Sequence, residues 1–232
     1  MIPVFVVPVL DRYDLLVGME NSVDEEVRRY YVVDNGGRYE IENKPFWEDR
    51  HICRPGANLG FSASINLAIK ANLRAPWWFF SNDDMVYAPG DLAEMARLMW
   101  AAEGPLAVFL ENCGYAAFAI NDQAIEAAGW FDENYHPAYC EDCDWDWRAR
   151  LAGVWRTDMP SSSRHLASKT ILGDINRRKS NDRTFPKNKK YHLSKWGGEE
   201  PREEVYATPF NAGGDPYATV APKLSRLREL AW

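Results

Sequence analysis

The chain has 232 residues, of which 46% are hydrophobic and 10 are tryptophans, so it is long enough to bury the core of one domain. Its formal net charge of −7 and its pI of ≈ 5.2 argue against a general nucleic-acid-binding protein, which depends on a basic surface. The sequence has no run of about 18 apolar residues, so we expect no membrane span.

Residues 1–102 alternate between patterns that are typical of strands and of helices. Runs rich in β-branched and aromatic residues predict strands over 4–9, 30–33, 49–53 and 77–80. Apolar residues at helical spacing predict helices over 15–27, 62–73 and 91–102, the second with Ser62 as its N-cap. Strands that alternate with helices indicate an α/β fold with a mainly parallel sheet and helices on both faces.

The rest of the chain has a mixed pattern. Residues 106–110 and 115–120 predict further strands, and 141–152 predicts a helix that ends at Gly153. From residue 179 onward Pro, Gly, Asn and charged residues dominate, which predicts a loop-rich extension that covers the sheet edge as a lid or is partly disordered. The basic run 177–190 is then a solvated or anion-facing loop. We therefore divide the chain into a main domain, 1–178, and a C-terminal extension, 179–232.

The N-terminus and the cysteines indicate the compartment. The apolar residues 1–10 have neither a basic segment nor a small-residue cleavage site, so they predict a first strand and not a signal peptide. The chain has 4 cysteines, for which reduced thiols are the simpler interpretation. We therefore expect a cytoplasmic protein.

A first acidic cluster directly follows the predicted strand 77–80. It consists of Asn82, Asp83 and Asp84, at the carboxyl end of a strand, where open α/β sheets bind ligands. One carboxylate there could reach a divalent cation that bridges a diphosphate leaving group, and the other could hold a ribose hydroxyl or a metal-bound water. The alternative is a simple turn cap, because Asn and Asp are common turn residues.

A second acidic cluster, Glu141, Asp142 and Asp144, opens the predicted helix 141–152. The helix dipole favours acidic residues in a first turn, so capping explains them as well as catalysis does. The same dipole keeps these groups ionised, as a general base requires. His165 could join a carboxylate in binding a cation, or it could be an ordinary surface or core residue. A metal, a base and a sheet edge together suggest transfer of a group from a phosphorylated donor.

A competing metal site lies close to the second cluster. His136, Cys140 and Cys143 have H-x3-C-x2-C spacing and could supply three zinc ligands, with a fourth from elsewhere. The two cysteines also share one helix face, where small apolar side chains can simply pack. We favour packing.

Several segments match motifs of one enzyme family in order and spacing. Residues 32–36, Val-Val-Asp-Asn-Gly, resemble the end of its second strand, and 58–66 match its N-x-G-x5-N loop and helix. Residues 81–84 lie at its D-x-D site, and 128–148 match its G-x-F-D-E … E-D-x-D … R stretch. His165 with Thr170 resembles its late H-x4-T segment, and Lys-Trp-Gly-Gly at 195–198 recurs in such tails. The chain thus resembles the GT-A glycosyltransferases of the inverting family 2 type, in particular rhamnosyltransferase-like bacterial and phage members.

The resemblance implies an enzyme that moves a sugar, with inversion, from a UDP- or dTDP-sugar to a hydroxyl of a glycan, lipid-linked or protein acceptor. It implies Mn²⁺ or Mg²⁺ bound by Asp84 and His165, catalysis by Asp142 as general base together with Glu141, and an acceptor or sugar pocket with Trp130 and Glu141. The implied donor-binding residues are Pro8, Arg12, Asp34, Asn35, Asn58, Gly60, Phe61, Asn66, Asn82 and Asp83. Asn82 departs from the Asp that many members have there, which leaves Asp84 as the main metal carboxylate with Asp83 in support.

Two other functions stay open at this point. A nucleotidyltransferase-like enzyme would also use sheet-edge carboxylates and a metal, but it would release pyrophosphate, and the Gly-rich basic loop common in such enzymes is not found near the start of the chain. A non-catalytic module could keep the fold and hold glycans or nucleotides with its tryptophans. A product assay separates the first from sugar transfer, and slow donor hydrolysis would argue against the second.

Overall fold

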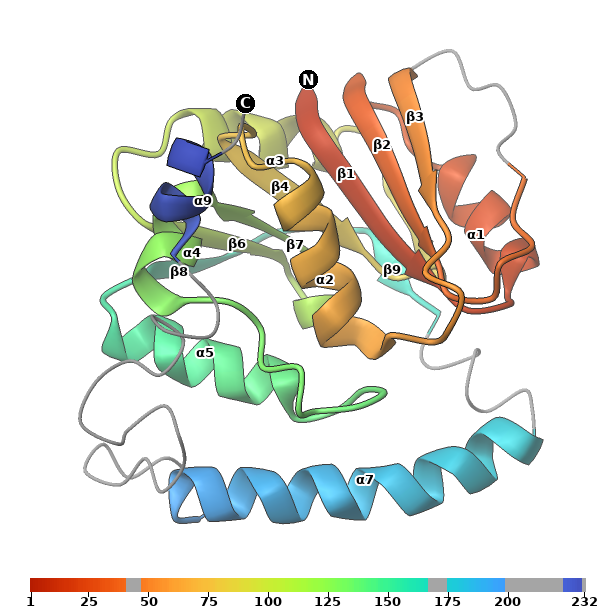
Figure 1. Cartoon of the computed structure of the whole chain (residues 1–232). Helices are drawn as coiled ribbons and strands as arrows, with labels where there is room; N and C mark the ends of the chain where they lie inside the picture. The colour runs from red at the N-terminus through yellow and green to blue at the C-terminus, as the bar shows by residue number, and fades with distance from the viewer. Residues whose placement is uncertain (41–46, 167–174, 199–222, 231–232) are drawn as a thin grey trace.

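The computed structural model describes residues 1–40, 47–166, 175–198 and 223–230 (Figure 1). Its centre is a seven-stranded sheet with the order β3-β2-β1-β4-β7-β6-β8. The strands are β1 (Ile2–Val9), β2 (Val27–Asp34), β3 (Trp47–Cys53), β4 (Trp77–Ser81), β6 (Leu106–Leu110), β7 (Ala117–Asn121) and β8 (Trp155–Met159). Only β7 runs antiparallel to its neighbours in this sheet, and every other pair is parallel. The mainly parallel α/β sheet is confirmed.

Two hydrophobic cores, one on each face of the sheet, hold the layers together. Along β1, Phe5 and Val7 point into one core and Val4 and Val6 into the other, because side chains alternate across a strand. The first core is covered by α1 (Tyr13–Glu20) and α3 (Asp91–Trp100). The second is covered by α2 (Gly60–Ala71), α4 (Asp122–Ala128), α5 (Glu141–Leu151) and the short α9 (Leu224–Leu230).

Three smaller elements complete the body of the molecule. A two-stranded antiparallel sheet joins β5 (Met85–Val86), just after β4, to β9 (Arg164–His165). A short 3-10 helix, η1 (Gly114–Ala116), follows β6. No helix in the described part of the chain is both long and apolar enough to cross a membrane.

The long helix α7 (Ile175–Trp196) lies outside the other layers, alongside α5 and the loop that precedes it (Figure 1). The sequence predicts a loop-rich chain from residue 179. That prediction is wrong over 179–196, where the chain is helical. The helix includes Pro186, and its inner face buries Asn188, His192 and Lys195 against the body. Tertiary packing of one face therefore stabilises a segment that its own composition does not favour. The proposed domain boundary at 178/179 lies inside α7.

Other predicted boundaries shift by a few residues. Helix α1 ends at Glu20, whereas the prediction reached residue 27. Helix α2 begins at Gly60, so Ser62 lies within the helix and is not its N-cap as predicted. The Ser62 hydroxyl is buried there and has no hydrogen-bond partner among the described residues. Strands β5, β8 and β9 and the helices α4 and α9 were not predicted. Thr170 and most of the predicted extension, 199–222, lie outside the described residues.

Candidate active site

A cleft of ≈ 480 Å³ opens at the carboxyl ends of β1, β2 and β4, where parallel sheets bind ligands. Most of the predicted site residues line it, although they come from separate parts of the chain. They are Pro8, Asn35, Asn58, Gly60, Phe61, Asn82, Asp83, Asp84, Glu141, Asp142 and His165. The structure therefore brings the two acidic clusters and the histidine to one cavity.

One wall of the cleft is the loop that leads into α2. The Asn35 amide ties this loop to the end of β2, since its Oδ1 accepts a hydrogen bond from Leu59 N at 2.9 Å. Gly60 has a φ of +76°, and a Cβ there would lie 2.5 Å from the carbonyl oxygen of Pro137. Phe61 N donates to the same oxygen at 2.7 Å. Glycine is therefore required where the α2 loop touches the opposite wall.

Asp84 and His165 converge through the small β5–β9 sheet. Met85 pairs with His165 across this sheet, and His165 Nε2 lies 2.9 Å from Asp84 Oδ1. The Asp84 side chain is 3% exposed and the imidazole 26%. A carboxylate oxygen and an imidazole nitrogen at one point are suitable ligands for Mn²⁺ or Mg²⁺. Within the described residues no group of three or more His, Cys, Asp or Glu side chains could hold a metal ion by itself. A cation at Asp84 and His165 would therefore need further oxygens from a bound ligand such as a diphosphate.

Asp83 and Arg12 lie beside this pair. Asp83 is buried and lines the cleft. The Arg12 guanidinium is hydrogen-bonded to Asp14, with Nε 2.8 Å from Oδ1, and does not line the cleft. That hydrogen bond is the main cause of the raised pKa of Arg12, to which the charges of Asp83 and Asp84 add. Arg12 thus contributes positive charge near the cleft without entering it.

The opposite wall carries the second acidic cluster at the start of α5. Asp142 is half-buried, and its Oδ1 accepts a hydrogen bond from Cys143 N at 2.8 Å, within its own helix turn. Glu141 is 6% exposed, and its Oε2 has no hydrogen-bond partner among the residues that the structure describes. Burial, followed by the charge of Asp142, raises the pKa of Glu141 to about 8. Near neutral pH Glu141 is therefore largely protonated and can donate a hydrogen bond into the cleft.

The raised pKa of Glu141 makes folding stability depend on pH. The folded protein keeps the Glu141 proton up to pH about 8, whereas the unfolded chain loses it near 4.5, so stability from this group falls as pH rises through that window. We expect Glu141→Gln to gain stability relative to the wild type between pH 5 and pH 8. The gain should be at least about 1.4 kcal/mol, the equivalent of one pKa unit. Urea unfolding of both proteins at the two pH values measures it, and a constant difference would contradict the buried, protonated state.

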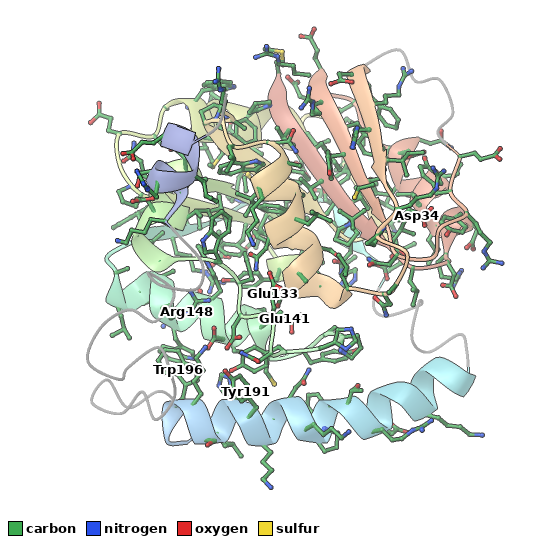
Figure 2. The ribbon with its side chains drawn as sticks, in the orientation of Figure 1. Asp34, Glu133, Glu141, Arg148, Tyr191 and Trp196 are labelled. Atoms are coloured by element: carbon green, nitrogen blue, oxygen red, sulfur yellow. The ribbon has the colours of Figure 1, made fainter. Side chains whose placement is uncertain are left out.

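Two residues predicted to bind the donor support the site from behind. Asp34 is buried at the end of β2 (Figure 2), where its oxygens accept hydrogen bonds from Tyr13 Oη, Gly37 N and Tyr39 N, each at 2.8 Å. Asn66 lies on the buried face of α2 and hydrogen-bonds both backbone groups of Phe131. Neither residue lines the cleft, and the chain itself uses their polar atoms, so direct donor contacts of Asp34 and Asn66 stay a prediction.

Trp130, which the sequence predicts to contact a sugar, also lies away from the cleft. Its ring is buried in the core beneath α2, α4 and α5, with the Lys70 ammonium 5.3 Å from the ring centroid on the outer side. It does not line the cleft. The apolar ring is more stable within this core than in water, which is the ordinary role of a tryptophan.

The structure does not support the zinc alternative. His136, Cys140 and Cys143 all belong to the described residues, and they form no group that could hold a metal. His136 Nε2 instead lies 3.0 Å from Asn58 O, across the cleft wall. Cys143 is exposed on α5.

Two aromatic residues that line the cleft were not predicted to belong to the site. Tyr139 lies two residues before Glu141, the first residue of the second acidic cluster. Tyr115 lies in η1, and its buried hydroxyl has no hydrogen-bond partner in the described part of the chain. An aromatic residue beside an acidic motif is a signal that could have identified Tyr139. No local pattern marks Tyr115, which the turn after β6 brings to the cleft.

The strand order, the reversed β7 and the cleft at the carboxyl ends define the GT-A glycosyltransferase fold. The chain is similar to the mannosyltransferase PcManGT from Pyrobaculum calidifontis, solved with GDP-Man and Mn²⁺: TM-score 0.57, 12% identity, 98% of this chain and 74% of that one. It is also similar to S. aureus TarS, with TM-score 0.54 and 13% identity over 98% of this chain and 50% of TarS. At these identities the likeness concerns the fold.

Sequence comparison gives a short match. A stretch of 38 residues is 53% identical to a galactofuranosyl glycosyltransferase of Leishmania donovani. The stretch is 16% of this chain and spans only 9% of that relative. No family model matches the chain.

Proposed function

We propose that this chain is a glycosyltransferase that moves a sugar from a nucleotide-diphosphate sugar to an acceptor hydroxyl with inversion. The observation that carries the proposal is a single cleft with Asp84 and His165 on one wall and Asp142 on the other. The glycosyltransferase fold and the short match to a galactofuranosyl glycosyltransferase support the same class of reaction. The acceptor is a glycan, a lipid-linked saccharide or a protein side chain.

In the proposed reaction Asp142 is the general base. It accepts the proton of the acceptor hydroxyl while that oxygen bonds to the anomeric carbon from the face opposite the diphosphate. The bond from the anomeric carbon to the diphosphate oxygen breaks in the same step, and the electron pair leaves with the nucleoside diphosphate. One displacement of this kind inverts the anomeric configuration. Protonated Glu141 would donate a hydrogen bond to a sugar hydroxyl beside the reacting centre.

The donor would occupy the cleft between β1, the α2 loop and the residues that follow β4. The side-chain amides of Asn58 and Asn82 line this part of the cleft and can form hydrogen bonds with the donor. The Asp83 carboxylate can accept a hydrogen bond from a ribose hydroxyl. Asp84 and His165 would hold Mn²⁺ or Mg²⁺. When bound, such a cation supplies positive charge to the departing diphosphate.

Nucleotide binding is the first test of this function. We would measure the thermal stability of the protein with UDP, dTDP, GDP and CMP, each with and without Mn²⁺. A ligand at a hundred times its Kd that binds only the folded state adds about 2.7 kcal/mol. Stabilisation by one nucleotide would name the base of the donor, and no stabilisation by any of them would count against the proposal. Release of pyrophosphate from the matching nucleoside triphosphate in the presence of a sugar phosphate would instead favour a nucleotidyltransferase.

The metal pair gives a separate prediction. We expect Asp84→Ala to weaken nucleotide binding in Mn²⁺ by at least about tenfold, because even outer-shell partners of a metal are typically worth 10–100-fold. Binding in metal-free buffer should change much less. Titration calorimetry in the two buffers measures both affinities, with Asp49→Ala as a control, since Asp49 is an exposed carboxylate paired with Arg29. Equal affinities of Asp84→Ala and the wild type in Mn²⁺ would remove Asp84 from the site.

A further inference from the structure

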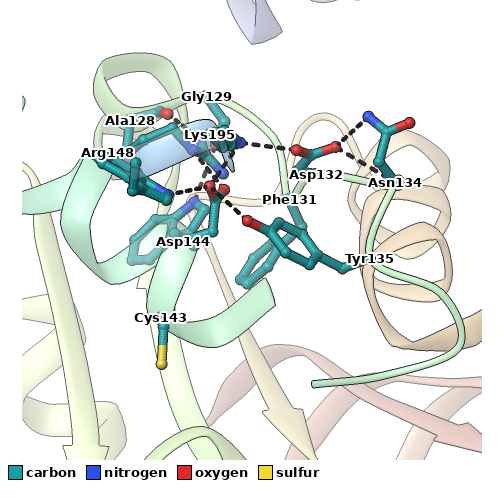
Figure 3. A network of polar contacts seen from close by, with 12 residues as sticks. Ala128, Gly129, Phe131, Asp132, Asn134, Tyr135, Cys143, Asp144, Arg148 and Lys195 are labelled. Atoms are coloured by element: carbon teal, nitrogen blue, oxygen red, sulfur yellow. Dashed lines mark hydrogen bonds and ion pairs between the residues drawn. The ribbon is translucent and has the colours of Figure 1, made fainter. Parts of the chain in front are cut away.

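Lys195 is a buried cation that the proposed reaction does not use. Its side chain is 0% exposed, and its Nζ lies 2.7 Å from Asp132 Oδ2 and 2.6 Å from Asp144 Oδ1 (Figure 3). Burial lowers the pKa of Lys195. Burial opposes the ionisation of Asp132, but the charge and hydrogen bond of the ammonium, together with hydrogen bonds from Asn134 N and Tyr191, lower the pKa of this carboxyl. Because a buried charge without partners is costly, the three groups hold one another in place.

Helix α7 adds two further donors to the same carboxylates. Tyr191 Oη donates to Asp132 Oδ2 at 2.8 Å, and Trp196 Nε1 donates to Asp144 Oδ1 at 2.9 Å. Tyr191 and Trp196 point from α7 toward α5 (Figure 2). We call Asp132, Asp144, Tyr191, Lys195 and Trp196 the α7 lock. The C-terminal end of α7, residues 191–196, thus binds two carboxylates from two other parts of the chain.

The α7 lock holds both ends of the segment that carries the proposed base. Asp132 precedes this segment, and Asp144 lies in the first turn of α5, two residues after Asp142. A shift of Asp144 would therefore move the first turn of α5 and the cleft wall with it. Since a catalytic group must be placed to within a fraction of an ångström, contacts that fix the turn can decide the rate.

The backbone of this segment needs such support. Tyr139 and Cys140 have φ values of +82° and +73°, a left-handed conformation that non-glycine residues adopt only when their surroundings hold them there. Helix α7 supplies a contact at this point as well. Asn188 Nδ2 donates to Ala138 O at 2.8 Å and to Tyr139 O at 3.2 Å. The helix therefore touches the segment at its strained middle and at both ends.

We propose that Lys195 is a positioning residue, which holds the first turn of α5 through the α7 lock so that Asp142 faces the cleft. The inference rests on the proposed function, in which Asp142 is the base. It gives a role to the Lys-Trp pair at 195–196, which lies outside the cleft and about 50 residues from the base.

The test compares Lys195→Met with a control that is destabilised elsewhere. Met replaces the ammonium with an apolar group of similar length. The control is Leu224→Ala. Leu224 belongs to α9, is 2% exposed and packs in the core that α4 also covers, so its loss should destabilise the fold. It does not line the cleft. Both proteins are compared at a temperature well below their melting points. Two readouts are taken: hydrogen exchange of amides 138–144, and donor turnover with its pH profile.

We expect Lys195→Met to exchange amides 138–144 at least tenfold faster than the wild type and to lower kcat at least tenfold. The KM for the donor should stay within twofold, and the acidic limb of the kcat profile should move, because the surroundings of Asp142 change. Leu224→Ala should have a lower melting temperature, while exchange of amides 138–144 and kcat stay as in the wild type. Unchanged exchange in Lys195→Met, or equal losses of kcat in both variants, would overturn the proposal.

A second variant covers the case in which Lys195→Met does not fold. The pair Asp132→Asn with Lys195→Met removes one buried charge of each sign and leaves Asp144 with Arg148, whose Nε lies 3.0 Å away. We expect it to fold and to show the same faster exchange of amides 138–144, and wild-type exchange would overturn the proposal. If the wild type itself binds no nucleotide and turns over no donor, the proposed function fails, while the exchange readout still decides whether Lys195 holds the segment.

Discussion

Asp142→Asn is expected to lower sugar transfer by about 10²–10⁴-fold, the usual contribution of a positioned general base. Asparagine has nearly the same shape but cannot accept a proton at this site. The backbone contact from Cys143 N to the side-chain oxygen can persist in the variant, since an amide oxygen also accepts. Nucleotide affinity should therefore stay within about twofold while kcat falls, the signature of an interaction that acts mainly in the transition state.

A carboxylate away from the cleft supplies the control for Asp142→Asn. Asp49→Asn makes the same chemical change at an exposed side chain of β3 that is paired with Arg29. We expect its kcat to match that of the wild type. Steady-state kinetics with donor and acceptor, and with donor and water, measure both variants. Near-wild-type transfer by Asp142→Asn would show that another group is the base, and Glu141 would be the next carboxylate to change.

The sheet could be predicted from the sequence because each strand is a local pattern. The apolar runs over 4–9, 77–80 and 106–110 lie almost at the bounds of β1, β4 and β6. Such strands are buried on both faces, so they need apolar residues at nearly every position. Strands β8 and β5 lacked this signal, because Trp155–Met159 contains charged and exposed residues and Met85–Val86 is too short to carry a pattern.

The cleft could be predicted in outline because its residues follow directly on predicted strands or open a predicted helix. Three of the predicted residues that do not line the cleft, Asp34, Asn66 and Trp130, were assigned from motif positions. A motif does not show whether a side chain faces the cleft or the core. Asn66 has the spacing of a donor-binding residue, yet its amide satisfies the backbone of Phe131, which lies 65 residues away. Only the fold reveals that partner.

Helix α7 shows the limit of local patterns most clearly. Its polar, proline-containing sequence predicts a loop, and the contacts that make it a helix come from Asp132 and Asp144 on other elements. Both aspartates belong to the stretch 128–148 that matches the family motif. In the structure they take part in the α7 lock. Glu141 and Asp142 are therefore the acidic residues of this stretch that line the cleft.

The same contacts predict a large loss of stability for Asp144→Ala. Its carboxylate is fully buried and faces Lys195 Nζ at 2.6 Å, Trp196 Nε1 at 2.9 Å and Arg148 Nε at 3.0 Å. Removing it leaves two buried cations with one carboxylate fewer, and breaking a buried pair in this way typically costs about 3–5 kcal/mol.

Urea unfolding of Asp144→Ala and of a surface control measures this loss. The control is Asp158→Ala, whose side chain is 57% exposed and 3.7 Å from Arg156, so its loss should stay within about 1 kcal/mol. Since α7 contributes Lys195 and Trp196, the Asp144 variant should also lose these α7 contacts, which faster hydrogen exchange of the α7 amides 188–196 would report. Equal unfolding midpoints for the two variants would mean that the contacts of Asp144 do not stabilise the fold. The attachment of α7 would then depend on its other contacts, among them those with Asp132 and Ala138.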